Sequence, residues 1–199
     1  MRVRSVALAP FMAAVFLATI LASGCSEPPY KEIHQAQGAL DAARAAGAET
    51  FANAEYRDAQ QALDQSQQAV AQRDYRLALR YALDARERAQ EAARAAADHK
   101  AEARGRAERA LTTAEGALRD AEQRLQAARE ARVKARDLTP ARHATENARS
   151  ALQKARAAME KEAYLDVPGI LEPAQVQLTE ALRELAARQT TRPPARRSR

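Results

Sequence analysis

Tryptophan is absent from this sequence, and cysteine occurs only once. A single cysteine excludes an internal disulfide, so packing alone must hold the fold together. Only 4% of the residues are aromatic, and no proline occurs between Lys31 and Thr139. Alanine, glutamate, arginine, glutamine and leucine dominate instead, and all five favour helices. The sequence therefore predicts an all-α chain.

Catalytic and metal-binding motifs are also missing. The histidines His34, His99 and His143 are isolated from one another, and none stands in a metal-binding spacing such as H-E-x-x-H. The sequence has no G-x-S-x-G elbow and no phosphate-binding glycine loop. We therefore expect no enzyme activity, no metal, no cofactor and no small-molecule substrate.

The charge of the chain is concentrated at its two ends. The formal net charge is +6, but seven of the 32 basic residues lie before Ser5 or after Ala187. The long segment between them is almost neutral, so the basic balance does not indicate a nucleic-acid surface. We expect no nucleic-acid partner.

The N-terminus reads as an export signal. Arg2 and Arg4 precede a run without charge from residue 6 to residue 22, and Ser23-Gly24 stand directly before Cys25. A basic start, an apolar run and small residues before a cut are typical of a secretory signal peptide. An ordinary cleaved signal would leave an unpaired thiol, and an uncleaved anchor would need about 20 apolar residues.

The segment Leu21-Ala-Ser-Gly-Cys25 resembles the lipobox of bacterial lipoproteins, with the leucine one position further out than usual. The resemblance implies that Cys25 is acylated and becomes the new N-terminus. Ser26, where an aspartate would favour the inner membrane, implies the periplasmic face of the outer membrane. The chain then divides into a signal peptide (1–24), an acylated cysteine with a short tether (25–30) and a helical body (31–188).

Alanine at helical spacing predicts the helices of the body. A first helix covers about residues 31–46 and stops at Gly47, and a second, capped by Thr50, ends near Gln72. Asp74 is expected to cap a third segment. In it alanines at 78, 82, 85, 89, 92 and 96 form one seam, and a second seam follows from 107 to 128.

The second seam starts one residue late, which predicts a bend, unwinding or break near Gly105. Thr139-Pro140 is expected to begin the next helix, as an N-cap followed by proline at the first position. Pro168 and Pro173 predict an interrupted last helix, regular only from about residue 172 to 187. Residues 189–199 read as a disordered basic tail.

The helices repeat along the chain. A shift of 89 residues aligns 33–97 with 122–186 without a gap, and it places Thr50 on Thr139 and Tyr75 on Tyr164. The sequence therefore predicts two tandem units, about 31–97 and 107–187. We expect an elongated antiparallel bundle of two three-helix units that share a long, bent middle helix.

The first unit also resembles a known alanine-rich envelope family. The resembling features are Ala42-Ala-Arg-Ala-Ala-Gly-Ala48, Ala59-x-x-Ala-Leu63, and the turn Gln72-Arg-Asp-Tyr75 followed by the alanines at 78, 82 and 85. They are similar to those of the domain of unknown function 4398. That family usually follows a lipoprotein signal, and related chains accompany OmpA-like, peptidoglycan-binding envelope proteins. The resemblance implies no catalytic site.

Two sets of residues are candidates for binding. Tyr56, Tyr75 and Tyr81 would line a groove between helices, although tyrosines also pack inter-helix turns. In the tail, arginines could meet phosphates or carboxylates, or stay solvated; they are Arg192, Arg196, Arg197 and Arg199. The sequence thus favours an outer-membrane lipoprotein with a structural or adaptor role. The alternatives are a peptide-binding or chaperone-like module, and peptidoglycan binding through the tail.

Overall fold

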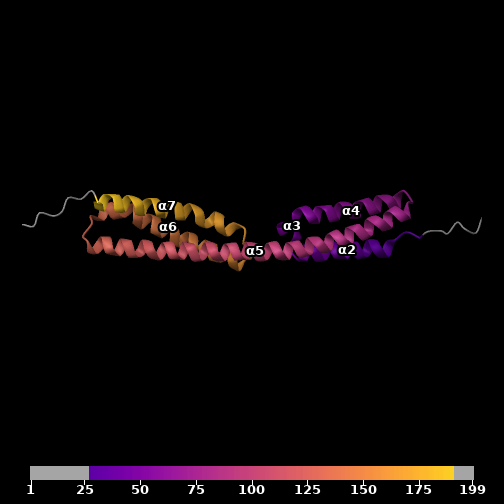
Figure 1. Cartoon of the computed structure of the whole chain (residues 1–199), viewed down its shortest axis with the longest axis horizontal. Helices are drawn as coiled ribbons and strands as arrows, with labels where there is room; N and C mark the ends of the chain where they lie inside the picture. Colours follow the sequence, from indigo (N-terminus) through magenta and orange to yellow (C-terminus); the bar gives the residue numbers. More distant parts are fainter. Residues whose placement is uncertain (1–26, 191–199) are drawn as a thin grey trace, which may run out of the picture. The chain divides into compact units, whose positions relative to one another are not determined.

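The computed structural model describes residues 27–190, which are helical almost throughout. The helices are α2 (Tyr30–Ala45), α3 (Ala48–Phe51), α4 (Asn53–Ala71), α5 (Tyr75–Glu130), α6 (Ala135–Glu160) and α7 (Asp166–Thr190). No strand occurs in this part of the chain. The all-α prediction is therefore confirmed, together with the long middle helix (Figure 1).

The chain divides into two compact units, with the boundary between Arg94 and Ala95, inside α5. In unit 1, α2, α4 and the first part of α5 pack around one another; in unit 2, the rest of α5 packs with α6 and α7 (Figure 1). Each unit is a three-helix arrangement that uses one part of the same helix. The predicted scheme of two units sharing a middle helix is confirmed.

The core of unit 1 is built mainly from alanine. On the part of α5 that belongs to unit 1, the completely buried residues are Ala78, Ala82, Ala85, Ala89 and Ala92. Such small side chains let neighbouring helices approach closely, so that many dispersion contacts replace a few large buried groups. The approach is close enough for buried Ser66 on α4 to donate a hydrogen bond to the carbonyl oxygen of Ala78, over 2.8 Å.

Unit 2 uses larger side chains. Leu178 and Val167 are among its most deeply buried residues. A cluster at one end of the unit contains Leu125, Ala128, Leu138, Ala141 and Leu185. Because leucine buries more apolar surface than alanine, fewer contacts supply the same stabilisation here.

The shift between the two alanine seams does not interrupt α5. Buried alanines recur every seven residues at 78, 85 and 92, and again at 107, 114, 121 and 128, which is one residue later than the first series would place them. The helix is continuous through Gly105 and is neither unwound nor broken there. Since each series packs within its own unit, the shift changes which side of α5 is buried.

Three helices end on a residue with positive φ that is not glycine. These residues are Arg73 (φ 61°), Arg132 (φ 53°) and Glu162 (φ 58°). At each end the following amide donates to a carbonyl five residues back, for example Asp74 to Ala69 and Val133 to Ala128. This is the Schellman pattern, which stops a helix by a left-handed turn.

The 89-residue repeat is visible in these helix ends. α4 ends at Ala71 and α6 ends at Glu160, which are 89 positions apart. The left-handed residues Arg73 and Glu162 have the same separation. The corresponding helices of the two units, α4 and α6, therefore end in turns of the same geometry.

Several predicted helix boundaries are wrong. Thr50 lies inside the short helix α3 and does not cap α4, which follows Ala52. Thr139 and Pro140 lie inside α6, because the turn at Arg132 lets that helix begin at Ala135. The Thr139 hydroxyl donates to the Ala135 carbonyl oxygen over 3.1 Å instead of capping.

The last helix is also longer than predicted. α7 runs unbroken from Asp166 to Thr190, and so it includes Pro168, Pro173 and two residues assigned to the tail. Pro168 falls in the first turn, where a missing N–H costs nothing. Pro173 removes one internal hydrogen bond, which the packing of Leu171, Leu178 and Leu182 offsets.

Two other boundaries are confirmed. Gly47 takes the left-handed conformation, with φ of 90°, directly after Ala46, the C-cap of α2. Asp74 caps α5, because its carboxylate accepts the backbone N–H of Leu77 over 3.0 Å.

Candidate functional site

Most of the predicted site residues lie outside the part of the chain that the structure describes. These are Cys25 and the tail arginines Arg192, Arg196, Arg197 and Arg199. The signal peptide falls outside it too. Their roles stay predictions.

The structure places the three tyrosines that were predicted to line a groove in different surroundings. Tyr56 is only 3% exposed and belongs to the core of unit 1. Tyr75 and Tyr81 are half-buried on α5. They are six residues apart, so at about 100° per residue they leave the helix on different sides. The structure therefore does not bring the three side chains together around one opening.

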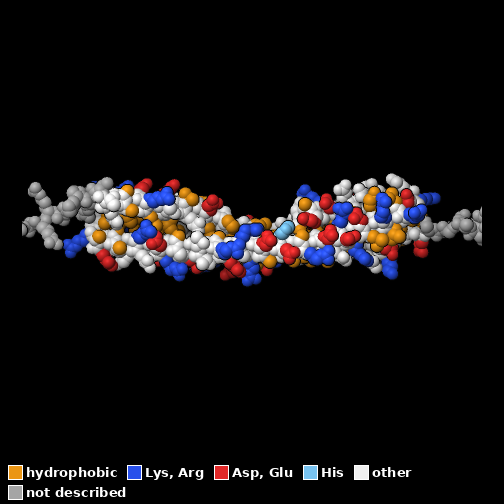
Figure 2. Space-filling view, in the orientation of Figure 1, with side chains coloured by type: hydrophobic (Ala, Val, Ile, Leu, Met, Phe, Trp, Pro, Cys, Tyr) orange, Lys and Arg blue, Asp and Glu red, His pale blue; other side chains and the backbone are white. Residues whose placement is uncertain are grey.

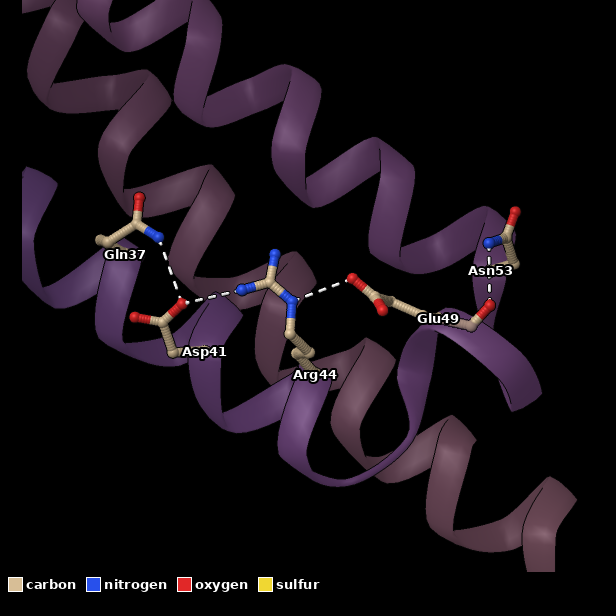
Figure 3. Close-up of polar contacts among 5 residues, drawn as sticks. All are labelled: Gln37, Asp41, Arg44, Glu49 and Asn53. Atoms are coloured by element: carbon tan, nitrogen blue, oxygen red, sulfur yellow. Dashed lines mark hydrogen bonds and ion pairs between the residues drawn. The ribbon is translucent and has the colours of Figure 1, made fainter.

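An arginine covers the ring of Tyr56. The guanidinium carbon of Arg44 lies 5.8 Å from the ring centre. Arg44 is itself held by Glu49 at 2.9 Å and by Asp41 at 3.5 Å, in the polar chain that Figure 3 draws. The hydrogen bond to Glu49, with the nearby Tyr56, raises the pKa of Arg44. This cluster closes the turn between α2 and α4, so its role is structural.

A groove of about 660 Å³ lies between α5 and α6 in unit 2. We call it the α5–α6 groove. Its lining is mainly polar: Glu122, Leu125, Gln126 and Arg129 come from α5, and Thr139, Arg142, His143, Thr145, Glu146 and Arg149 come from α6. Residues three and four apart share a helix face, which explains why these side chains converge.

One end of the α5–α6 groove is neutralised by ion pairs. Arg149 holds Glu122 through two nitrogens, at 3.1 Å and 2.7 Å, and it contacts Glu146 at 3.3 Å. These contacts, with the hydrogen bond to Glu122 first, raise the pKa of Arg149. Both Arg149 nitrogens donate to the same oxygen, Oε1 of Glu122, and a pair held in this way fixes its own geometry more than it attracts a ligand.

The other end of the groove offers free basic groups. Arg129 and Arg142 are exposed, and within residues 27–190 neither forms an ion pair. His143 stands between this groove and a smaller hollow of about 280 Å³ on the α6–α7 side, where Asn147 donates to Gln177 over 3.3 Å. The groove could therefore bind an acidic, extended ligand.

Catalytic chemistry finds no support in this arrangement. Within residues 27–190, no three His, Cys, Asp or Glu side chains gather as a metal site would require. The carboxylates of the α5–α6 groove are exposed or already paired with Arg149. A general acid or base needs a group whose pKa is shifted toward neutrality by burial or by a like charge.

The α5–α6 groove was not anticipated from the sequence. Its members are charged residues at ordinary helical spacing, which is also the pattern of a solvated helix face. Only the pairing of α5 with α6, set by contacts such as Arg156 to Glu115 at 2.7 Å, brings them together. No local signal could have distinguished this face from the others.

Comparison with known proteins adds no relative. The chain matches no family model, no curated protein and no solved structure. The resemblance to the domain of unknown function 4398 therefore stays a prediction. None of the helices within residues 27–190 is long and apolar enough to cross a membrane.

Proposed function

We propose that this chain is a lipoprotein anchored through Cys25 to the periplasmic face of the outer membrane, where its helical body acts as a structural or adaptor module without catalysis. The observation that carries the proposal is the segment Leu21-Ala-Ser-Gly-Cys25 after an uncharged run and a basic start. Two or more acyl chains on one cysteine give stable anchoring, whereas a single chain gives only marginal binding.

The helical body supports an adaptor role. Its two units present long exposed faces of alternating charge (Figure 2), and those faces suit lateral contacts with other envelope proteins. OmpA-like proteins and peptidoglycan are the partners that the family resemblance suggests. Arginines in the tail would add contacts to carboxylates or phosphates.

The anchor is tested by replacing its acylated residue. Cys25→Ser should abolish labelling by a fatty-acid probe and should release the protein from carbonate-washed membranes. Ser26→Ala, next to it, should keep both the label and the membrane fraction. Unchanged fractionation of the Cys25→Ser protein would refute a lipid anchor. Crosslinking in the native envelope then identifies what the body contacts.

The α5–α6 groove favours a second candidate function, the binding of an acidic peptide. The observation behind it is the pair of unneutralised arginines, Arg129 and Arg142, at one end of a groove large enough for a peptide. Replacing both by glutamate should remove crosslinks formed at the groove. Matched replacement of exposed Arg109 and Arg119 should leave them. Crosslinks that survive the first pair would exclude the groove as a binding site.

A further inference from the structure

Unit 1 exposes large apolar side chains in one region. Tyr30 is 55% exposed, Leu79 38% and Leu83 44%. Leu79 and Leu83 are four residues apart on α5, so they lie one above the other on the same side of the helix. The core of this unit is built mainly from alanine. Burying two leucines and a tyrosine would have stabilised it further, so their exposure calls for an explanation.

The alignment of α2 beside α5 places Tyr30, Leu79 and Leu83 at the same end of unit 1. Both helices run antiparallel to α4 and therefore parallel to each other (Figure 1). Arg86 on α5 donates to Gln35 on α2 over 2.9 Å. Five residues back from that bond along each helix are Tyr30 and Tyr81. Tyr30 therefore lies level with the turn of α5 that carries Leu79 and Leu83.

The same side of α5 faces α2. Arg86, which reaches α2, lies about one turn after Leu83 and two turns after Leu79, so the three leave α5 in similar directions. Tyr30, Leu79 and Leu83 thus form one apolar patch at the end of unit 1 where α2 begins. We call it the α2-end patch.

Basic residues stand close in the sequence to the members of the α2-end patch. Lys31, Arg73, Arg76 and Arg80 are all exposed. Within residues 27–190, no ion pair joins Lys31, Arg73 or Arg76 to an acid. Arg80 lies 5.4 Å from the centre of the Tyr81 ring.

Acids are present at this end but are less available. Asp74 is engaged in capping α5, and Asp84 pairs with Arg88 at 2.9 Å. Glu27, Glu32 and Glu87, which lies one turn after Leu83, remain. Figure 2 shows apolar side chains among both basic and acidic side chains over this end of unit 1. A few exposed apolar side chains with exposed basic residues close by match the chemistry of an anionic lipid surface, where the Tyr30 ring and the leucines enter the headgroup region and the cations meet phosphates.

The position of the patch in the chain identifies the membrane as its occupant. Tyr30 follows Cys25 by five residues, which span at most about 17 Å. If Cys25 is acylated, the end of unit 1 that carries the patch cannot leave the bilayer surface. The short tether would hold the patch near lipid, and a protein partner away from the membrane would not require the patch to lie there.

We propose that the α2-end patch rests in the headgroup region of the anchoring membrane, with Tyr30, Leu79 and Leu83 in contact with lipid and the nearby Lys and Arg side chains against anionic phosphates. This inference rests on the proposed lipid anchor. It adds that the protein has a second, non-covalent membrane contact that fixes which end of unit 1 meets the bilayer.

The absence of tryptophan from the chain provides a clean test. Leu79→Trp creates a single fluorophore in the patch, and Val176→Trp creates one at a 51% exposed position on α7 as its control. The acylated full chain is reconstituted into vesicles of phosphatidylethanolamine and phosphatidylglycerol, with or without brominated acyl chains. The tryptophan at 79 should emit at shorter wavelength and lose intensity on bromination, and the tryptophan at 176 should do neither.

The outcomes separate this proposal from the anchor on which it rests. A protein that fails to float with the vesicles overturns the anchor and the patch contact together. A protein that floats while the tryptophan at 79 remains unquenched overturns the patch contact alone. A blue shift without quenching, accompanied by dimers in sedimentation, would assign the patch to a second copy of the chain and also overturn it.

The basic residues are tested in the same vesicles. In the Leu79→Trp background, Arg76→Glu with Arg80→Glu should reduce the quenching and leave flotation intact. Arg109→Glu with Arg119→Glu, in unit 2, should change neither. Helical content by circular dichroism shows that each variant is folded. Quenching that is unaffected by the charge reversal, or equally strong in vesicles of neutral lipid alone, would overturn the role given to the cations.

Discussion

At the scale of single residues, buried alanine is the feature on which unit 1 depends. Ala85, Ala89 and Ala92 are fully buried on α5, so no space remains beyond their β-carbons. Interiors are packed about as densely as organic crystals, and an added methylene group must displace a neighbour. In this core, small size is a requirement at the seam, whereas in many cores alanine is merely tolerated.

The first prediction is that enlarging a seam alanine destabilises the protein. Ala89→Leu should lower the free energy of unfolding by about 1–3 kcal/mol, because the larger side chain forces the helices apart. Chemical denaturation followed by circular dichroism measures the change. Ala97→Leu, at an exposed position on the same helix, should stay within about 0.5 kcal/mol of the parent. Equal effects of the two substitutions would show that the seam is not tightly packed.

One ion pair ties the turn between α6 and α7 to the middle helix. The ammonium of Lys100 on α5 lies 2.6 Å from a carboxylate oxygen of Glu162, whose backbone is in the left-handed conformation. The hydrogen bond from Lys100 lowers the pKa of Glu162, and the same bond raises the pKa of Lys100. Both groups face solvent, so salt should screen the interaction.

The second prediction concerns pH. Because the pKa of Glu162 is lower in the folded chain, the pair stabilises the fold above the ordinary carboxyl pKa and loses that effect as pH falls through the lowered value. Because the pKa of Lys100 is raised, the effect is also lost at alkaline pH, as pH rises through that raised value. Lys100→Gln should therefore move the pKa of Glu162 up toward its ordinary value, as read from an NMR titration of its carboxyl.

The matched control for this titration is Lys154→Gln, an exposed lysine of α6. It should leave the pKa of Glu162 where it is. High salt should shrink the difference between parent and Lys100→Gln. A carboxyl titration that Lys100→Gln does not move would mean that Arg104, the weaker neighbouring charge, sets the pKa instead.

The left-handed residues that end the helices could be predicted from the sequence only where the residue type itself favours that backbone conformation. Gly47 was identified as a left-handed stop because glycine adopts positive φ freely. Arg73, Arg132 and Glu162 also end helices with positive φ, but arginine and glutamate do not favour that conformation, so their residue type does not predict it. At these ends the stop is imposed by packing of the next helix. The α5–α6 groove escaped prediction for the same reason, since its residues become a site only through tertiary contact.

At the scale of helices, the two interior prolines show how packing overrides local preference. Pro140 lies in α6 and Pro173 in α7, where proline lacks the N–H for the internal bond and its ring meets the carbonyl four residues back. The sequence predicted that both would mark boundaries. Both helices continue because each has a buried stripe on either side, such as Leu171 and Leu178 around Pro173.

The third prediction follows from the two prolines of α7. Pro173→Ala restores a hydrogen bond to the Gly169 carbonyl and should raise the free energy of unfolding by about 1–2 kcal/mol, after the entropy gained by the unfolded chain is taken into account. Pro168→Ala should instead lower it, by up to about 1 kcal/mol, because a first-turn proline already fits the helix and rigidifies the unfolded chain. Thermal unfolding compares the two, and stabilisation by both substitutions would show that α7 begins before Asp166.

At the scale of the whole molecule, the periodicity of the sequence predicted the architecture more accurately than it predicted where individual helices begin and end. The 89-residue repeat and the alanine seams indicated two units on one long helix, and both are present. These signals are global and survive local errors such as those at Thr50 and Thr139. The α2-end patch could not be predicted, because Leu79 and Leu83 stand at spacing typical of a core and only the register with α2 leaves them exposed.

The last prediction concerns how the two units share stability. Leu178 is deeply buried in unit 2, and Leu178→Ala should cost about 2–5 kcal/mol there, from lost burial and the cavity left behind. Because unit 1 buries its own alanine core, hydrogen exchange should accelerate in α6, α7 and the part of α5 after Ala95, and much less in α2 and α4. An equal acceleration in α2 and α4 would mean that the continuous helix α5 couples the two units into one cooperative fold. Leu63→Ala, the reciprocal change in unit 1, should accelerate exchange in α2 and α4 and spare α6 and α7, so the pair of variants tests the independence of the units from both sides.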